Sequence, residues 1–188
     1  MTARLVYSVI CSLDGYVADS SGGFDWAAPD EEVHAAVNDL ERPVGTYLYG
    51  RRLYQTMAVW QTMGGPGEHP VESDYADIWR GAEKIVFSTT LGEVATPRTR
   101  VERRFDPDAI GELKRTATAD LSIGGPGLAA HAIRAGLVDD YQLFLVPVVV
   151  GGGLPALPSG VRRDLALVDE RRFASGTVLL RYRDPAVS

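Results

Sequence analysis

The feature that most constrains the fold is a regular alternation of short apolar segments with segments of helical periodicity. The first apolar segment, Leu5–Leu13, is rich in β-branched residues and ends at the turn signal Asp14-Gly15. After Pro29, apolar residues recur at helical spacing and predict a helix with one apolar face: Val33, Ala36, Val37 and Leu40. Strands that alternate with helices indicate a parallel sheet, because a parallel pair needs a long crossover connection.

The alternation continues along the chain. Strands are predicted at Thr46–Tyr49, Lys84–Ser88, Val101–Phe105, Leu121–Ile123 and Tyr141–Val150, and helices at Arg51–Ala58, Ser73–Arg80, Pro107–Thr116 and Leu128–Ala135. Pro147, within the last of these strands, indicates a bulge or an edge position. Leu165–Val168 and Thr177–Tyr182 then predict an antiparallel hairpin. The expected fold is α/β, one domain over residues 1–188. Its mostly parallel mixed sheet has helices on both faces and an antiparallel C-terminal hairpin.

The charge balance and the single cysteine narrow the class of protein. The 188 residues carry 19 Lys and Arg against 25 Asp and Glu, a net charge of −6, which argues against a nucleic-acid partner. The longest apolar run, Leu143–Val150, is far too short to span a bilayer. Cys11 has no second cysteine to pair with, and no secretory signal is apparent, so a cytoplasmic location is expected.

A glycine-rich turn follows the predicted strand Leu121–Ile123. Gly124-Gly125-Pro126-Gly127 leads directly into a predicted helix at Leu128. Such a turn brings free backbone N–H groups and the positive end of the helix dipole to one place, which suits a phosphate group. The alternative is a tight connection without a ligand. The spacing differs from G-x-G-x-x-G and the turn lies late in the chain, so a standard Rossmann site is not predicted.

A second turn places two arginines at the start of a predicted helix. Gly50 is followed by Arg51 and Arg52, where cations oppose the helix dipole unless an anion lies beside them. The planar guanidinium also suits a phosphate monoester. The alternative is a solvated pair. Together the two turns indicate a dinucleotide with an extra phosphate, NADPH, and hence an oxidoreductase.

A third group lies between the first strand and the first helix. The turn Asp14-Gly15 leads through a small polar loop to Trp26, and Asp30, Glu31 and Glu32 follow. This group suits a lid with an aromatic wall and an acid that faces substrate. The alternative is a core tryptophan and ordinary acids at a helix start.

Several other catalytic signatures are missing. There is no P-loop and no G-x-S-x-G sequence, and three histidines, His34, His69 and His131, lack ligand-like spacing. No metal site is therefore expected, and catalysis would depend on a bound cofactor.

The order of motifs resembles that of the dihydrofolate reductase-like superfamily, in particular the reductase domain of the bifunctional riboflavin-biosynthesis deaminase/reductase and its stand-alone relatives. The motifs that carry the resemblance occur in sequence over nearly the whole chain: Ser12–Ala18, Phe24–Trp26, Tyr49–Tyr54, Lys84–Ser88, Ile123–Leu128 and Gly136–Tyr141.

The resemblance implies NADPH bound across the carboxyl edge of the sheet. Gly50, Arg51 and Arg52 match the residues that hold the 2′-phosphate, and Ser88 and Thr89 match those near the adenosine. The pyrophosphate position matches the turn formed by Gly124, Gly125, Pro126, Gly127 and Leu128. The resemblance also implies a homodimer.

The implied activity is reduction of a small heterocyclic, carbonyl or imine substrate by NADPH, similar to 5-amino-6-(5-phosphoribosylamino)uracil reductase. Dihydrofolate reduction and a non-catalytic nucleotide-binding or sensor role are the alternatives. Ala129 and Ala130 replace an aromatic often found after the double glycine, which argues against folate.

The substrate is expected between the loop that holds Asp14, Gly15 and Trp26 and the helix start, with the Gly151–Pro158 loop as the alternative. Asp30 and Glu31 are the catalytic candidates. Counting from Pro29 favours Glu31, whereas the apolar face of the helix favours Asp30 and Glu32.

Overall fold

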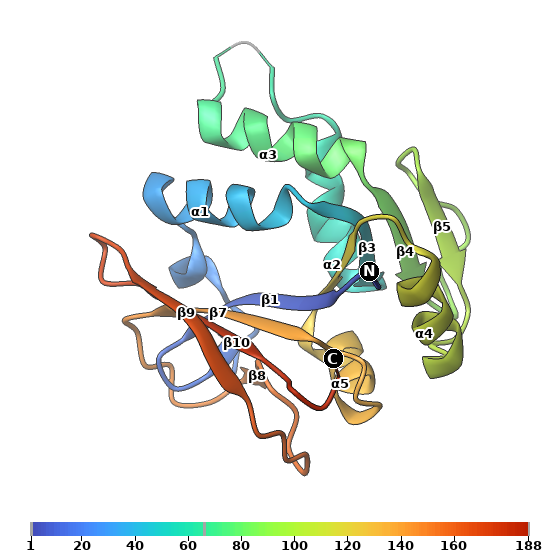
Figure 1. Cartoon of the computed structure of the whole chain (residues 1–188). Coiled ribbons are helices and arrows are strands. Elements are labelled where there is room, and N and C mark those ends of the chain that lie inside the picture. Colours follow the sequence, from blue (N-terminus) through green and yellow to red (C-terminus); the bar gives the residue numbers. More distant parts are fainter. Residues whose placement is uncertain (1, 66, 188) are drawn as a thin grey trace.

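An eight-stranded sheet forms the centre of the computed structural model, which describes residues 2–65 and 67–187 (Figure 1). In spatial order the strands are β5 (Thr99–Glu102), β4 (Glu83–Phe87), β3 (Val44–Gly50), β6 (Asp120–Gly124), β1 (Leu5–Ser12), β7 (Asp140–Val146), β10 (Val178–Arg183) and β9 (Ala166–Arg172). Two short strands, β2 (Tyr16–Ala18) and β8 (Leu154–Pro155), pair with each other beside this sheet.

In the eight-stranded sheet the strands pair in parallel from β5 to β7, and β10 and β9 run antiparallel to their neighbours. Helices make the crossovers: α1 (Glu31–Glu41), α2 (Arg51–Met57), α3 (Pro70–Gly81), α4 (Pro107–Thr116) and α5 (Pro126–Arg134). Two 3₁₀ turns, η1 (Asp25–Ala27) and η2 (Ala58–Gln61), complete the helical elements of the described residues. The predicted mixed α/β sheet with an antiparallel C-terminal hairpin is confirmed.

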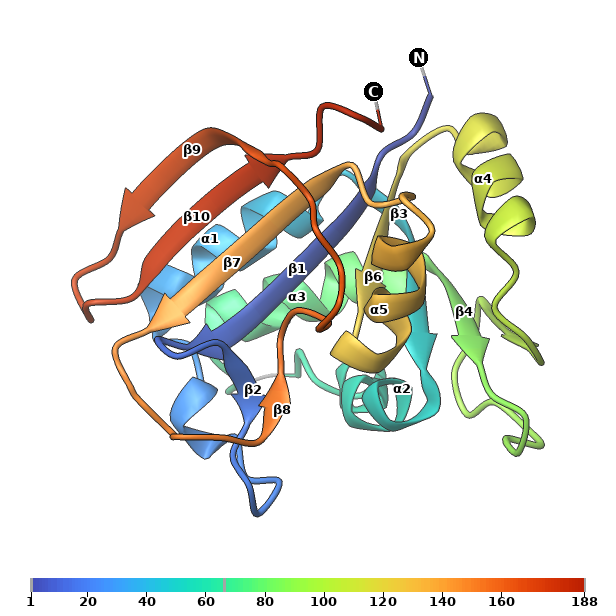
Figure 2. The same cartoon turned by 90° about the horizontal axis from the view of Figure 1, so that it is seen from below.

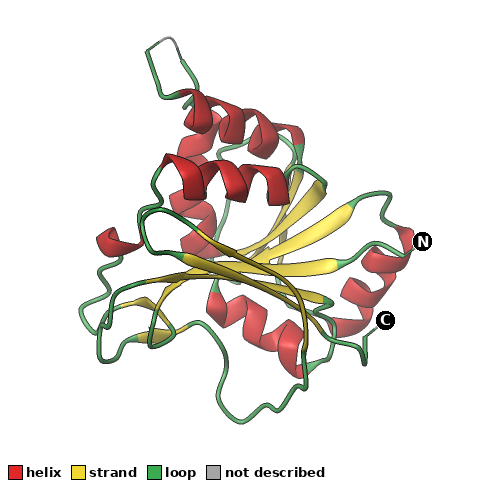
Figure 3. Cartoon of the chain, turned by 60° about the vertical axis from the view of Figure 1, so that its left-hand side comes forward, coloured by secondary structure: helices red, strands yellow, loops and turns green. Residues whose placement is uncertain are grey.

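Helices cover both faces of the sheet, as the sequence predicts. Figure 3 shows α1 and α3 on one side and α4 and α5 on the other. Strand alternation decides which side chains meet which helices. On β3, Leu48 packs in the α4–α5 layer, whereas Tyr47 and Tyr49 pack in the layer of α3.

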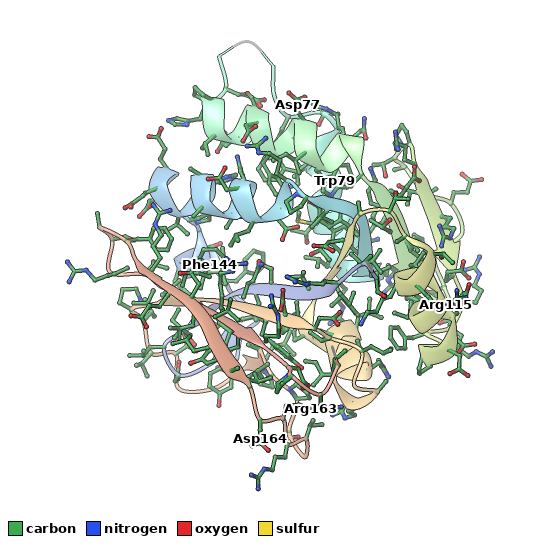
Figure 4. The ribbon with its side chains drawn as sticks, in the orientation of Figure 1. Asp77, Trp79, Arg115, Phe144, Arg163 and Asp164 are labelled. Atoms are coloured by element: carbon green, nitrogen blue, oxygen red, sulfur yellow. The ribbon has the colours of Figure 1, made fainter. Side chains whose placement is uncertain are left out.

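Large side chains fill the layer above the sheet. Trp79 of α3 is fully buried with Tyr47 and Tyr49, and Phe144 of β7 packs against Val33 of α1 and against Phe173 (Figure 4). Burial of this much aromatic surface is a principal source of stability in a domain of this size. It fixes α1 and α3 relative to the strands that carry the candidate site.

Several element boundaries differ from the prediction, among them those of β7, α5 and β9. β7 ends at Val146 instead of Val150, because Pro147 has no N–H to continue the ladder, so this proline lies past the strand rather than at a bulge. The helix expected at Leu128 begins at Pro126, the residue type favoured in the first turn. The strand expected at Leu165–Val168 extends through Arg172 as β9, which is exposed along its whole length.

The two chain ends lie close to each other at the amino edge of the parallel strands (Figure 2). The opposite, carboxyl edge carries α2, the start of α5 and the β2–β8 pair. None of the described helices is long and apolar enough to cross a membrane.

Candidate active site

The two predicted phosphate-binding turns meet at the carboxyl edge of the sheet. β3 and β6 are hydrogen-bonded neighbours, with Tyr49 opposite Gly124, so the turn at Gly50 and the turn at Gly125 lie side by side. The carboxyl ends of adjacent parallel strands, at a point where the connections diverge, are the usual ligand position in open α/β sheets. The sheet order therefore brings together two motifs that are far apart in sequence.

The turn after β6 contains glycines of three different kinds. Gly125 has φ +83, a conformation that favours glycine. A Cβ at Gly124 would lie 2.5 Å from Cδ2 of Leu53 and 3.0 Å from Cε1 of Tyr49, so close packing of α2 on β3 favours glycine here. A Cβ at Gly127 would meet nothing within 4 Å, and its φ is ordinary. Neither conformation nor packing accounts for Gly127, which leaves open space at the start of α5.

The first turn of α5 offers donors to a ligand in that space. A helix leaves its first N–H groups without a carbonyl partner inside the helix, and here the first position is Pro126, which has none to offer. Gly127 and Leu128 supply the next two N–H groups. This donor set and the space above Gly127 fit a pyrophosphate.

Arg51 extends from the start of α2 to the loop after β4. Its Nη1 donates to Oγ1 of Thr90 at 2.9 Å, and the side chain is exposed. Arg52 is also exposed, and a Cβ at Gly50 would meet nothing within 4 Å. Two cations beside open space fit a phosphate monoester.

The loop after β4 is held in a defined shape. Oγ of Ser88 accepts the N–H groups of Thr90 at 3.2 Å and Leu91 at 3.0 Å, and Nη1 of Arg103 donates to the carbonyls of Ser88 and Leu91. Ser88 therefore shapes the loop through its side chain. Thr89, predicted beside it, is exposed at the turn. Thr90 was missed because its contact with Arg51 spans 39 residues.

Asp14 joins the loops that follow β1 and β7. One carboxylate oxygen accepts the Ser12 hydroxyl at 2.6 Å and the N–H of Val150 at 3.2 Å, and the other accepts the N–H of Gly151 at 2.8 Å. These hydrogen bonds, the one from Ser12 foremost, hold the pKa of Asp14 below its ordinary value. Gly15, φ +87, completes the turn. Asp14 thus holds the turn after β1 and the loop after β7 in fixed positions relative to each other.

The loop after β7 lies directly against β2. A Cβ at Gly153 would overlap the carbonyl oxygen of Ala18, so only glycine fits there. β2 and β8 pair through Ala18 and Leu154. The Gly151–Pro158 loop, the alternative substrate position, and the Asp14 loop therefore form one continuous wall.

A cavity of about 210 Å³ opens between the carboxyl ends of β1 and β7, the η1–α1 connection and the β9–β10 turn. Its apolar wall comes from Ile10, Val33, Val146 and Pro147 and from the stretch 27–29. The polar groups of the lining are Asp30, Ser175 and Thr177. The sequence offered no sign of the last two, because they reach the cavity from the C-terminal hairpin.

The three acids near the start of α1 have different surroundings. Asp30 lines the cavity, and its Oδ1 caps α1 by accepting the Val33 N–H at 2.8 Å. This bond and one from the Ser175 hydroxyl hold its pKa below the ordinary value. Glu31 is exposed, 3.7 Å from Nε2 of His69. Glu32 accepts from Arg171 and from the Ala174 N–H. Of the three, Asp30 is the acid in the cavity wall.

Trp26 lies in η1, next to the cavity wall. Its side chain is half-buried, and Nε1 is buried without a hydrogen-bond partner among residues 2–65 and 67–187. Ala27 and Ala28, the next two residues, line the cavity. Trp26 itself does not line the cavity, so the predicted aromatic wall is not formed by this residue.

A family model for the RibD C-terminal domain matches residues 3–179. The chain belongs to the RibD C-terminal domain family. This confirms the resemblance that the order of motifs indicated. Membership of this family indicates a reductase-type domain.

Individual relatives of this RibD-type chain match over nearly its whole length. The uncharacterized protein YyaP of Bacillus subtilis (strain 168) is 28% identical over 182 residues, 95% of this chain and 94% of YyaP. A crystal structure from Shewanella sp. PV-4, named for riboflavin biosynthesis, is 20% identical, with a TM-score of 0.74 over 96% of this chain and 98% of the other. A pyrimidine reductase-like protein from Corynebacterium diphtheriae is 14% identical, with a TM-score of 0.68 over 96% and 91%. The two structures support the same fold.

Proposed function

We propose that this RibD-type domain, residues 1–188, is an NADPH-dependent reductase of a small heterocyclic substrate. The observation that carries the proposal is the position of the glycine turn between β6 and α5. This turn lies between the exposed arginines after β3 and the Asp30 cavity, and all three are at one edge of the sheet. A dinucleotide bound there has its phosphates at one end and its reactive ring toward β1 and the cavity.

The residues of the chain divide the binding of NADPH between them. The N–H groups of Gly127 and Leu128 bind the pyrophosphate, and the bare Cα atoms of Gly125 and Gly127 allow it to approach the backbone. Arg51 and Arg52 bind the 2′-phosphate, with Gly50 leaving room for it. The loop of Ser88 and Thr89 borders the adenosine.

NADPH, when bound, supplies a hydride. The chain then has to orient the substrate, exclude water and deliver a proton, so that a C=N or C=O bond gains one hydride and one proton. The lowered pKa of Asp30 leaves its carboxylate ionised near neutral pH, so Asp30 orients the substrate and holds the water molecule that delivers the proton. The Asp14 loop and the Gly151–Pro158 loop, which Asp14 holds together, limit access of bulk water.

The substrate class follows from the same cavity. A flat ring fits between the apolar wall and the Asp30 carboxylate, which accepts N–H donors at the ring edge. This favours a CH–NH or CH–OH type of product, with pyrimidines and pterins as the first compounds to test.

The test is oxidation of NADPH, followed by the loss of its absorbance, with a panel of substrates. The panel contains 5-amino-6-(5-phosphoribosylamino)uracil, the same compound after removal of its phosphate, dihydrofolate and small carbonyl compounds. Oxidation that needs both protein and one of these compounds is the expected result. Saturable NADPH binding without oxidation of any compound would contradict the reductase and favour a sensor.

A homodimer is part of the same proposal and rests on the family resemblance. Light scattering of the purified chain should give twice the mass of one chain, and a mass of one chain would contradict it.

A further inference from the structure

The cavity that Asp30 lines carries one charged side chain, and that side chain is negative. The rest of the lining is apolar except for the hydroxyls of Ser175 and Thr177. No lysine or arginine lines the cavity in the part of the chain that the structure describes. The only formal charge in the wall is therefore negative.

Further acids flank the lining residues. Asp25 immediately precedes the segment that contributes Ala27 and Ala28, and Glu31 follows Asp30. Asp25 and Glu31 are exposed. At physiological ionic strength charges interact over about 8 Å, so these carboxylates add to the negative potential at the cavity.

The two consecutive arginines of β9, Arg171 and Arg172, are engaged or face elsewhere. Nη2 of Arg171 donates to Glu32 at 3.1 Å, and its guanidinium lies 4.6 Å from the centroid of the Phe173 ring. Arg172 alternates to the opposite face of β9 from Arg171. Neither arginine therefore supplies a positive charge to an anion in the cavity.

Three other cations of the chain lie away from the cavity. Both lysines of the chain are buried elsewhere: Lys84 donates to backbone carbonyls beside Trp79, and Lys114 pairs with Asp139. Arg51 follows β3, three strand spacings from β7, or roughly 14 Å. The proposed function also assigns that arginine to the cofactor.

A phosphate group at this cavity would face the Asp30 carboxylate and would gain no counter-charge from the lining. The repulsion between the two anions disfavours its binding there. A ring N–H donor or a cationic ring gains from the same carboxylate, because the Val33 cap uses Oδ1 of Asp30 and leaves lone pairs on Oδ2.

We infer that the substrate of this cavity is a neutral or cationic flat heterocycle without a phosphate group, in contrast to a phosphoribosyl pyrimidine. The inference rests on the proposed function for the location of the site. On this inference, the negative charge of the cavity selects substrates without a phosphate group.

The experiment compares matched pairs of compounds that differ only by a phosphate. The dissociation constants of 5-amino-6-(5-phosphoribosylamino)uracil and of its phosphate-free form are measured by calorimetry on the NADPH-loaded protein. Uridine 5′-monophosphate and uridine form a second pair. The phosphate-free member of a pair should bind about tenfold more tightly or better, a difference of about 1.4 kcal/mol.

A cation added to the cavity rim should change this preference. Ser175 is exposed and lines the cavity, so Ser175→Lys should reduce the preference for the phosphate-free member severalfold. Thr116→Lys, an exposed position at the end of α4, adds the same charge elsewhere and should leave the preference unchanged.

Equal or tighter binding of the phosphorylated members would overturn the inference, even if NADPH is oxidised. Binding of neither member of either pair would overturn it as well. Preference for the phosphate-free members without any NADPH oxidation would support the inference and contradict the reductase, so the two failures are distinguishable.

Discussion

Oδ2 of Asp14 accepts the backbone N–H of Gly151 at 2.8 Å, across 137 positions of sequence. The other oxygen accepts from Ser12 and Val150. A single carboxylate thus joins the turn after β1 to the loop after β7, and the first residue of that loop, Pro147, lines the proposed substrate cavity. The contact explains why an acid in a tight turn belongs to the site without lining the cavity.

Asp14→Ala should loosen the loop after β7. Three hydrogen bonds to one carboxylate are lost, so amide hydrogen exchange of Val150 and Gly151 should accelerate, and substrate turnover should fall more than NADPH affinity. Because the pKa of Asp14 is lowered in the folded protein, its stabilisation is present above the ordinary pKa of 3.8 and is lost as the pH falls through the lower folded value. Asp106→Ala, which removes the cap of α4, is the control and should leave exchange at Gly151 unchanged. Unchanged exchange in Asp14→Ala would contradict the prediction.

Gly127→Ala and Gly124→Ala should separate ligand binding from packing. At Gly127 a methyl group meets only open space, so the stability of the free protein should stay within about 1 kcal/mol of the parent. NADPH affinity should nevertheless fall at least tenfold, because the methyl group occupies the space proposed for the pyrophosphate. Gly124→Ala should instead lower stability by about 1–3 kcal/mol through its contact with Leu53. Thermal unfolding and fluorescence titration measure the two effects, and full NADPH affinity in Gly127→Ala would exclude the proposed pyrophosphate position.

Arg51→Ala should reduce the preference for NADPH over NADH. The guanidinium already points across the site to Thr90, and loss of a charged hydrogen bond to phosphate corresponds to about 1.5–3 kcal/mol, or roughly tenfold to hundredfold in affinity. NADH affinity should change little. Arg162→Ala, whose side chain is 86% exposed and pairs with Asp164, is the matched control. Equal affinity of the unaltered protein for both cofactors would refute the assignment.

Asp30→Asn should abolish most of the turnover without unfolding α1. Asparagine is as good a helix cap as aspartate, so the hydrogen bond to the Val33 N–H is retained. It lacks the negative charge that holds the substrate N–H and the proton-delivering water, so turnover should fall about hundredfold or more at unchanged NADPH affinity. Glu31→Gln, the other candidate from the sequence, should have the smaller effect because Glu31 is exposed beside His69. Asp39→Asn, an exposed acid later on α1, controls for charge. A larger loss in Glu31→Gln than in Asp30→Asn would reverse the assignment.

Glu41→Gln should change how stability depends on pH. Burial between α1 and the sheet raises the pKa of Glu41 from 4.5 to about 7. The folded protein therefore binds a proton that the unfolded chain has lost between these pH values, and stability falls as the pH rises from about 4.5 to 7. The shift corresponds to about 3 kcal/mol. Glu41→Gln should remove this slope, so urea unfolding at pH 5 and pH 8 should show the variant gaining stability relative to the parent at pH 8. If the free energy of unfolding changed by the same amount between pH 5 and pH 8 in the parent and in Glu41→Gln, the raised pKa would be contradicted.

Local patterns in the sequence determined the elements and their order. The helical spacing after Pro29 gave the face of α1 that packs on Phe144, and the alternation of strands with helices gave the parallel sheet. Gly124–Gly127 and Gly50–Arg52 were recognisable because glycine and arginine have short-range physical roles in turns and at helix starts. These features depend on neighbours within a few residues, and a single sequence contains that information.

The contacts that assemble the site were decided only in the tertiary structure. Arg51 meets Thr90, and Ser175 reaches the cavity from the hairpin at the other end of the chain. The choice among three consecutive acids was likewise open, since each faces a direction set by the rotation of α1 on the sheet. That rotation is fixed by the burial of Val33 against Phe144 and Phe173, and burial between distant segments leaves no mark in local spacing.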